Sequence, residues 1–177
     1  LPSHYNIAVL AKAALTEAST FYAQGGVAAV LDETDSIQQH INDTMVAGAQ
    51  LCELHAVKQT VEGGKPTVDF LLEQGVQFTL DEDEQLHLTR EGGHSQRRII
   101  HSADATGKAI STTLVERAKE RKNITIFENY IAIDLITLHK LGHLDQANRA
   151  IGLYALDESA EQVHTFLAPF TALACGG

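Results

Sequence analysis

The sequence predicts an α/β fold, and three features of the chain carry this prediction. Residues 7–10 form a short apolar run, which is typical of a buried parallel strand. Helical patterns fill most of the middle of the chain, and from residue 124 the pattern changes to strands separated by turns. A strand, then helices, then a β-meander that returns to an apolar strand is an α/β order.

The helices are predicted from their end signals and their apolar stripes. One begins after Asp35 and Ser36, which are both good N-caps. Its apolar stripe holds Ile37, Ile41, Met45 and Val46. Further helices are expected over 55–62, 67–74 and 107–121. Glycines end two of them, at Gly63–Gly64 and at Gly75, and Pro66 suits a first helical turn. The inward residues of the last helix are Ile110, Leu114, Val115 and Ala118.

The strands are predicted from apolar and alternating patterns bounded by turn residues. A hairpin is expected from residues 76–80 and 85–89, with the acidic residues 81–84 as a solvated turn between them. Calcium would need alternating oxygen ligands and a glycine bend, which this turn lacks. Four later strands are expected over 124–127, 130–139, 150–156 and 163–174.

Composition excludes several classes of protein. The 177 residues are 44% apolar and 20% charged, which fits one domain with an ordinary core, and the net charge of −10 argues against general nucleic-acid binding. The longest apolar runs are too short for a membrane span. The two cysteines fit a reducing compartment, so a cytoplasmic location is expected. The nine histidines and these cysteines lack metal-ligand spacing, so no metal is expected.

Two segments have the composition of ligand-binding loops. The first combines hydroxyls, an amide and two glycines, in the order Ser19, Thr20, Phe21, Tyr22, Ala23, Gln24, Gly25 and Gly26. Such a loop can present bare backbone N–H groups to a flat polar ligand, although a surface turn has similar composition. The second segment, residues 87–98, crowds an acid, several bases and paired glycines together. It is either a binding loop or a solvated charged loop, and an anion-facing role is open for Arg90, Arg97 and Arg98.

Together these segments identify a family. The chain resembles the fumarate reductase/succinate dehydrogenase flavoprotein family in the order of its motifs. These motifs are Lys12, Ser19-Thr20-…-Gln24-Gly25-Gly26, Thr89-Arg90-Glu91-Gly92-Gly93-His94-Ser95, Ala103-Asp104-…-Thr106-Gly107 and Ala174-Cys175-Gly176-Gly177. Residues 89–95, named the Glu91 block below, are similar to the corresponding motif of the L-aspartate oxidase branch of this family. The resemblance implies that residues 1–177 are a fragment, truncated at both ends, of a Rossmann-like FAD-binding domain. The pyrophosphate-binding Gly-x-Gly-x-x-Gly loop would precede Leu1, so we expect this fragment alone to be inactive and to hold FAD weakly.

The resemblance also implies a reaction and roles for particular residues. Lys12 would follow the second strand of the domain, residues 19–26 would lie along FAD, and Glu91 would orient L-aspartate. Oxidation to iminoaspartate would serve NAD biosynthesis, with oxygen or fumarate as electron acceptor and quinolinate synthase acting next. FAD would be non-covalent, because Ser19 stands where related dehydrogenases have a flavin-linked His. Cys175 and Gly63–Gly64 depart from the family pattern. A fumarate reductase or succinate dehydrogenase subunit and a non-catalytic binding domain stay open as alternatives.

Overall fold

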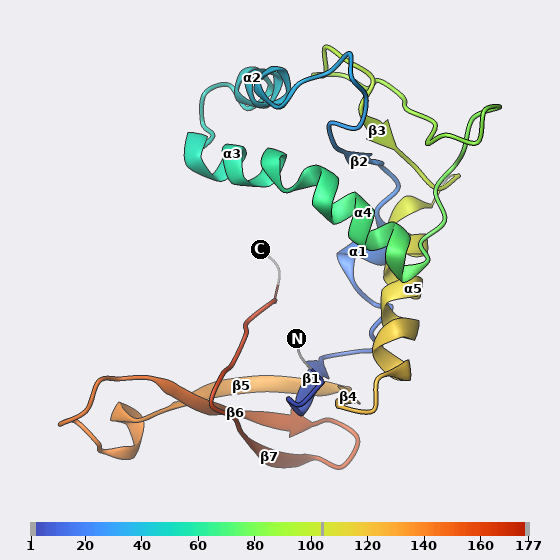
Figure 1. Ribbon diagram of the computed structural model, residues 1–177. Coiled ribbons are helices and arrows are strands. Elements are labelled where there is room, and N and C mark those ends of the chain that lie inside the picture. Colours follow the sequence, from blue (N-terminus) through green and yellow to red (C-terminus); the bar gives the residue numbers. More distant parts are fainter. Residues whose placement is uncertain (1–2, 104, 176–177) are drawn as a thin grey trace. The chain divides into compact units, whose positions relative to one another are not determined.

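The computed structural model describes residues 3–103 and 105–175, which form two compact units (Figure 1). Residues 18–118 make up the helical unit, and the described parts of 1–17 and 119–177 make up the strand unit. Asp104, Gly176 and Gly177, which belong to the motifs above, lie outside the described residues. No helix among the described residues is long and apolar enough to cross a membrane.

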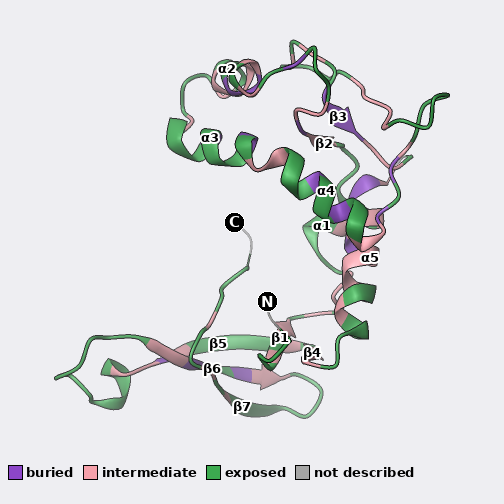
Figure 2. Cartoon of the chain, in the orientation of Figure 1, coloured by how far each residue is buried: buried purple, intermediate pink, exposed green. Residues whose placement is uncertain are grey.

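The helical unit is built from helices around a minimal sheet. Its elements in chain order are α1 (Ser19–Tyr22), β2 (Val27–Ala28), α2 (Ile37–Ala47), α3 (Leu54–Glu62), α4 (Gly64–Gln74), β3 (Ile99–Ile100) and α5 (Thr106–Glu120), whose last residues belong to the strand unit. Strands β2 and β3 pair antiparallel. The main core lies around them, and its buried members are Ala29, Val68, Leu71, Val76, Phe78 and Ile100 (Figure 2). A second buried cluster joins α2 to α3 through Ile41, Val57 and Val61.

The predicted helix ends in this unit are mostly confirmed. The Ser36 hydroxyl caps α2 by accepting a hydrogen bond of 3.2 Å from the Gln39 amide, and Gly75 ends α4 at a φ of +97°. The inward placement of Val46 is wrong, because its side chain is 79% exposed. Ile37, Ile41 and Met45 follow one another at four-residue spacing and complete the buried stripe without it.

The strand unit pairs parallel and antiparallel strands. Strand β1 (Ile7–Ala11) runs parallel to β4 (Ile124–Glu128), as the apolar run at 7–10 predicts, but its residues are half-buried, with Ala8 exposed, and not fully buried as expected. The meander consists of β5 (Tyr130–Thr137), β6 (Ala150–Asp157) and β7 (Gln162–Leu167), in that order. A short 3₁₀ turn, η1 (His139–Leu141), follows β5.

Three sequence predictions need correction. The strand expected over 163–174 ends at Leu167, just before Pro169, which has no N–H for a sheet hydrogen bond. The hairpin expected at 76–89 is reduced to a bridge between Leu80 and Leu86. The loop expected from Thr20 begins with one helical turn, α1, which is too short to be stable without tertiary support.

Candidate functional site

Glu91 lies on a loop of the helical unit whose two arms meet at their base. The Thr89 amide donates to the Ile99 carbonyl at 2.9 Å, and the Arg98 amide donates to the Thr89 carbonyl at 3.1 Å. Between these arms, the His94 amide donates to the Glu91 carbonyl at 3.3 Å and closes a turn. Gly93 adopts a φ of +84°, which side chains disfavour, so glycine suits this turn. Residues 91–94 are named the Glu91 turn below.

Arg98 is fully buried beneath this loop in a network of carboxylates. Its Nε and Nη2 donate to the two oxygens of Asp35 at 2.7 Å each, a bidentate arrangement. Its Nη1 donates to Asp43 Oδ2, also at 2.7 Å. The side chains of Arg98 and Asp35 are 0% and 1% exposed. The positive charge of Arg98 is therefore paired with carboxylates inside the protein, and this arginine does not face a bound anion.

Asp43, on α2, connects the network to the Glu91 loop. Its Oδ2 also accepts from the Ser95 amide at 2.8 Å and from the Ser95 hydroxyl at 2.7 Å. Burial alone would raise the pKa of Asp43, but the bonds from Ser95 and Arg98 outweigh it and hold this pKa at about 2. The Asp43 carboxylate is therefore ionised at neutral pH.

This low pKa predicts how acid affects stability. Because the folded pKa of Asp43 is below its ordinary value of 3.8, its contribution is complete above about pH 4 and is lost as pH falls toward 2. We expect the free energy of unfolding, measured in urea, to decrease across this range more steeply in the wild-type protein than in Asp43→Asn. Parallel curves for the two proteins would contradict the assignment.

Two histidines lie beside this network. His94 Nδ1 is 3.4 Å from Arg98 Nη1, and its ring centroid is 5.7 Å from that of His40. His40 is buried, and in the described structure its Nδ1 has no hydrogen-bond partner. Burial lowers the pKa of His40, as does the positive charge of Arg98. The sequence indicates neither His40 nor Asp43 as a site residue, and it marks Asp35 only as a helix cap.

The Glu91 carboxylate itself is available to a ligand. The residue is exposed, and within residues 3–103 and 105–175 its side chain has no hydrogen bond or ion pair. In the described structure Glu91 therefore forms no ion pair with the neighbouring arginines Arg90, Arg97 and Arg98. The role of Glu91 in orienting a substrate stays a prediction.

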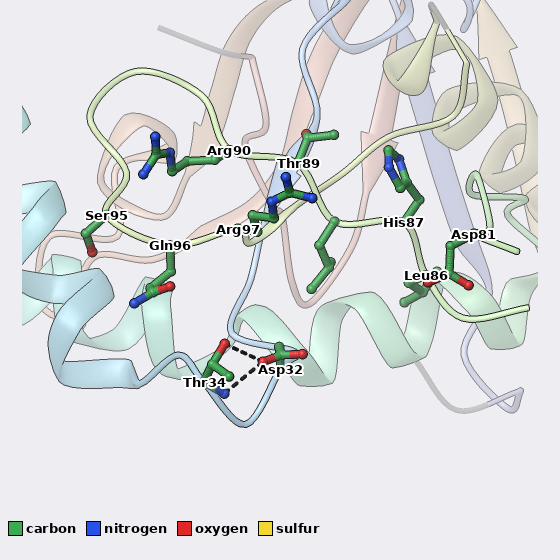
Figure 3. A pocket seen from close by; sticks show the side chains of 11 residues that line it. Asp32, Thr34, Asp81, Leu86, His87, Thr89, Arg90, Ser95, Gln96 and Arg97 are labelled. Carbon is green, nitrogen blue, oxygen red and sulfur yellow. Dashed lines mark hydrogen bonds between the residues drawn. The ribbon is translucent and has the colours of Figure 1, made fainter. Parts of the chain in front are cut away.

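A pocket of about 1020 Å³ opens beside the same loop (Figure 3). Arg90 and Arg97 reach it from the two arms, and neither guanidinium has an ion-pair partner in the described part of the chain. Asp32, across the pocket, accepts from the amide and the hydroxyl of Thr34, and these bonds lower its pKa. The described residues contain no group of three or more side chains placed to hold a metal ion.

The proposed flavin segment, residues 19–26, rests on the start of α5. The Gly107 amide donates to the Ala23 carbonyl at 3.1 Å, and a Cβ on Gly107 would lie 1.9 Å from the Thr20 carbonyl oxygen. Lys108 Nζ lies 5.7 Å from the centre of the Phe21 ring. Ser19, Thr20 and Gln24 are exposed, as is Gly25, where an added Cβ meets nothing within 4 Å. An exposed polar strip on a closely packed base fits contact with a flat, hydrogen-bonding cofactor.

An added methyl group is expected to destabilise the protein at Gly26 but not at the neighbouring Gly25. At Gly26 a Cβ would lie 2.3 Å from Ile99 Cγ2 and 2.4 Å from the Ile100 carbonyl oxygen, whereas at Gly25 the space is open. We expect Gly26→Ala to destabilise the protein by about 1–3 kcal/mol, since the buried strand β3 must shift. Gly25→Ala is the matched control. Urea midpoints of the flavin-free proteins test this, and equal midpoints for the two variants would contradict it.

Lys12 belongs to the strand unit and directly follows β1. It is exposed. The next residues are held by Glu128, at the end of the parallel strand β4, whose Oε1 accepts from the Leu15 amide at 2.8 Å. Ligands of α/β proteins bind at the carboxyl ends of parallel strands, so the place of Lys12 fits a cofactor role. Glu128 has no local sequence signal that would mark it as part of a site.

Comparison with known families identifies the chain. The family model described as "FAD binding domain" matches residues 3–177. The chain belongs to this FAD-binding family. The fold class expected from the sequence is confirmed, and FAD is the cofactor that the family indicates.

The relatives of this FAD-binding chain include L-aspartate oxidases in sequence and a fumarate reductase in structure. The chain is 82% identical over its whole length to an L-aspartate oxidase of Acinetobacter baylyi and 50% identical to that of Pseudomonas aeruginosa. It covers 32% and 34% of those proteins, so it spans about a third of the relatives it matches. Among solved structures, an E. coli quinol fumarate reductase superposes with a TM-score of 0.84 at 25% identity, over 93% of this chain and 27% of that one.

Proposed function

We propose that this chain is part of the FAD-binding domain of an L-aspartate oxidase, which converts L-aspartate to iminoaspartate. The observation that carries the proposal is the 82% identity to an L-aspartate oxidase along the entire chain. The fumarate reductase structure shares the fold at 25% identity, which supports the family more than the reaction. The Glu91 block supports the same branch, because an exposed carboxylate that has no partner among the described residues suits a substrate that carries an ammonium group.

The residues of this chain would position the cofactor and the substrate. Bound FAD would supply the hydride acceptor for the substrate carbon and pass the electrons on to oxygen or fumarate. Residues 19–26 would hold one side of the cofactor through exposed backbone N–H groups and the Ser19, Thr20 and Gln24 side chains, and Lys12 would add a positive charge. Glu91 would pair with the substrate ammonium. The proposal includes a cytoplasmic location for the enzyme and the use of its product, iminoaspartate, by quinolinate synthase.

The flavin is expected to be bound without a covalent bond. An unactivated serine hydroxyl is a poor nucleophile, so Ser19 cannot replace a flavin-linked histidine. When the full-length protein is precipitated with acid, we expect the yellow colour to stay in the supernatant. Flavin retained in the washed pellet would contradict this prediction.

The proposed function is tested with the full-length protein that contains these residues. Flavin absorbance of the purified protein separates an enzyme from a non-catalytic binding domain of the same fold. Turnover of L-aspartate then separates the oxidase from a succinate dehydrogenase or fumarate reductase subunit. We expect bound flavin, oxidation of L-aspartate and little oxidation of succinate. Succinate oxidation without L-aspartate oxidation would overturn the proposal.

A further inference from the structure

We infer that Asp43 is a positioning residue that fixes the Glu91 turn by binding Ser95 and Arg98 together. This inference rests on the proposed function, because it assigns the residue that sets where the Glu91 carboxylate lies. Within the described residues the hydrogen bonds of the Asp43 carboxylate go to Ser95 and Arg98 and not to Glu91. It acts through the residue that directly follows the turn.

The two ends of the Glu91 turn are held in different ways. At the start, Thr89 is fixed by its backbone bonds with Ile99 and Arg98. At the end, Ser95 has no comparable sheet partner in the described chain, and both of its bonds go to the single oxygen Asp43 Oδ2, at 2.8 and 2.7 Å. The contact between Ser95 and α2 spans 52 residues of sequence. A loop held at both ends loses less conformational entropy when it binds a ligand.

Asp43 is itself held in place by Arg98. The fully buried guanidinium donates to Asp43 through Nη1 and to Asp35 through Nε and Nη2. Asp43 sits on the second turn of α2, and Ile41 of the same helix is buried against α3. The carboxylate that receives Ser95 therefore belongs to a rigid element and has a fixed charge partner. Such support is what a binding loop needs to present a side chain in one geometry.

The proposal is tested by removing the Ser95 hydroxyl while leaving the Asp43–Arg98 pair intact. In the full-length, flavin-loaded protein, Ser95→Ala should lower kcat/KM for L-aspartate by roughly 3- to 10-fold, mainly through KM, as expected for one lost hydrogen bond. Fumarate reduction, which needs no ammonium contact, should change less than 2-fold, roughly. Ser95→Thr, which keeps the hydroxyl, should restore the L-aspartate value.

The matched control is Ser36→Ala, which removes another serine hydroxyl bond at α2 without touching the loop. It should lower thermal stability but leave the ratio of L-aspartate to fumarate activity unchanged. An unchanged ratio in both Ser95→Ala and Asp43→Asn would overturn the positioning role. An equal fall in both activities in Ser95→Ala, with flavin content intact, would overturn it as well.

A second measurement does not depend on the reaction. Arg90 and Arg97 are exposed and flank the Glu91 turn, so trypsin reports how firmly the loop is held. We expect cleavage after these residues, followed by mass spectrometry, to be roughly 3- to 10-fold faster in Ser95→Ala than in the wild type or in Ser36→Ala. Equal cleavage rates would overturn the inference. If L-aspartate is not oxidised but cleavage accelerates, the proposed function fails and the loop contact stands.

Discussion

Glu91→Gln in the full-length protein is expected to lower kcat/KM for L-aspartate by roughly 10- to 100-fold, the loss of one charged hydrogen bond. L-Aspartate differs from succinate by an ammonium group, and a carboxylate pairs most strongly with that group at a partly desolvated site. In the described structure the Glu91 carboxylate is exposed and has no partner within the protein, so none of its charge is used by neighbouring arginines. The glutamine retains the shape of the side chain and loses the charge.

The control for this variant is the reaction that lacks the ammonium. Fumarate reduction should change far less than L-aspartate oxidation, and the flavin content should match that of the wild type. Since Glu91 makes no ion pair in residues 3–103 and 105–175, its replacement should also leave the urea midpoint unchanged. Equal losses for the two substrates would favour a structural role of Glu91 and would weaken the assignment to L-aspartate oxidase.

The local signals of the sequence were sufficient for most of the helices and for the meander. A cap such as Ser36 or a stop such as Gly75 acts within a few residues, so the sequence shows it directly. The order β5-β6-β7 follows because strands that are consecutive in the sequence usually pair, here across the longer connection 138–149, which contains η1, and across the short turn 158–161. Strands β2 and β3 have only two residues each and pair across a long stretch of chain, so no periodic pattern could predict them.

The supporting network of the candidate site could not be predicted for the same reason. The sequence leaves an anion-facing role open for Arg98, but in the structure this side chain is buried, because Asp35 and Asp43, 63 and 55 residues away, bind its guanidinium. Neither carboxylate is unusual in its own segment. By contrast, the segments 19–26 and 87–98 have an unusual composition in consecutive residues, so the sequence alone marks them as candidate loops, and the family resemblance then implies the role of Glu91. The sequence motifs therefore indicate the exposed loop residues, whereas the buried network of Asp35, Asp43 and Arg98 is apparent only in the folded structure.

Replacing Arg98 is expected to cause the largest loss of stability. Arg98→Met removes both charged bonds to Asp35, whose carboxylate is almost fully buried, as well as the bond to Asp43. A buried charge left without its partner costs about 3–5 kcal/mol, whereas the pair itself contributes much less net stability. We expect the free energy of unfolding of the protein, measured in urea, to fall by that amount.

The neighbouring arginine provides the matched control. Arg97 has the same side chain and adjoins Arg98, but it is exposed and has no ion-pair partner in the described chain, so Arg97→Met should change stability by about 0.5 kcal/mol or less. Combining Arg98→Met with Asp35→Asn should recover part of the loss, because a buried neutral amide costs less than a buried carboxylate. Equal effects of Arg97→Met and Arg98→Met would contradict the buried network. If the double variant is instead less stable than Arg98→Met alone, then the unpaired charge of Asp35 is not the cause of the loss.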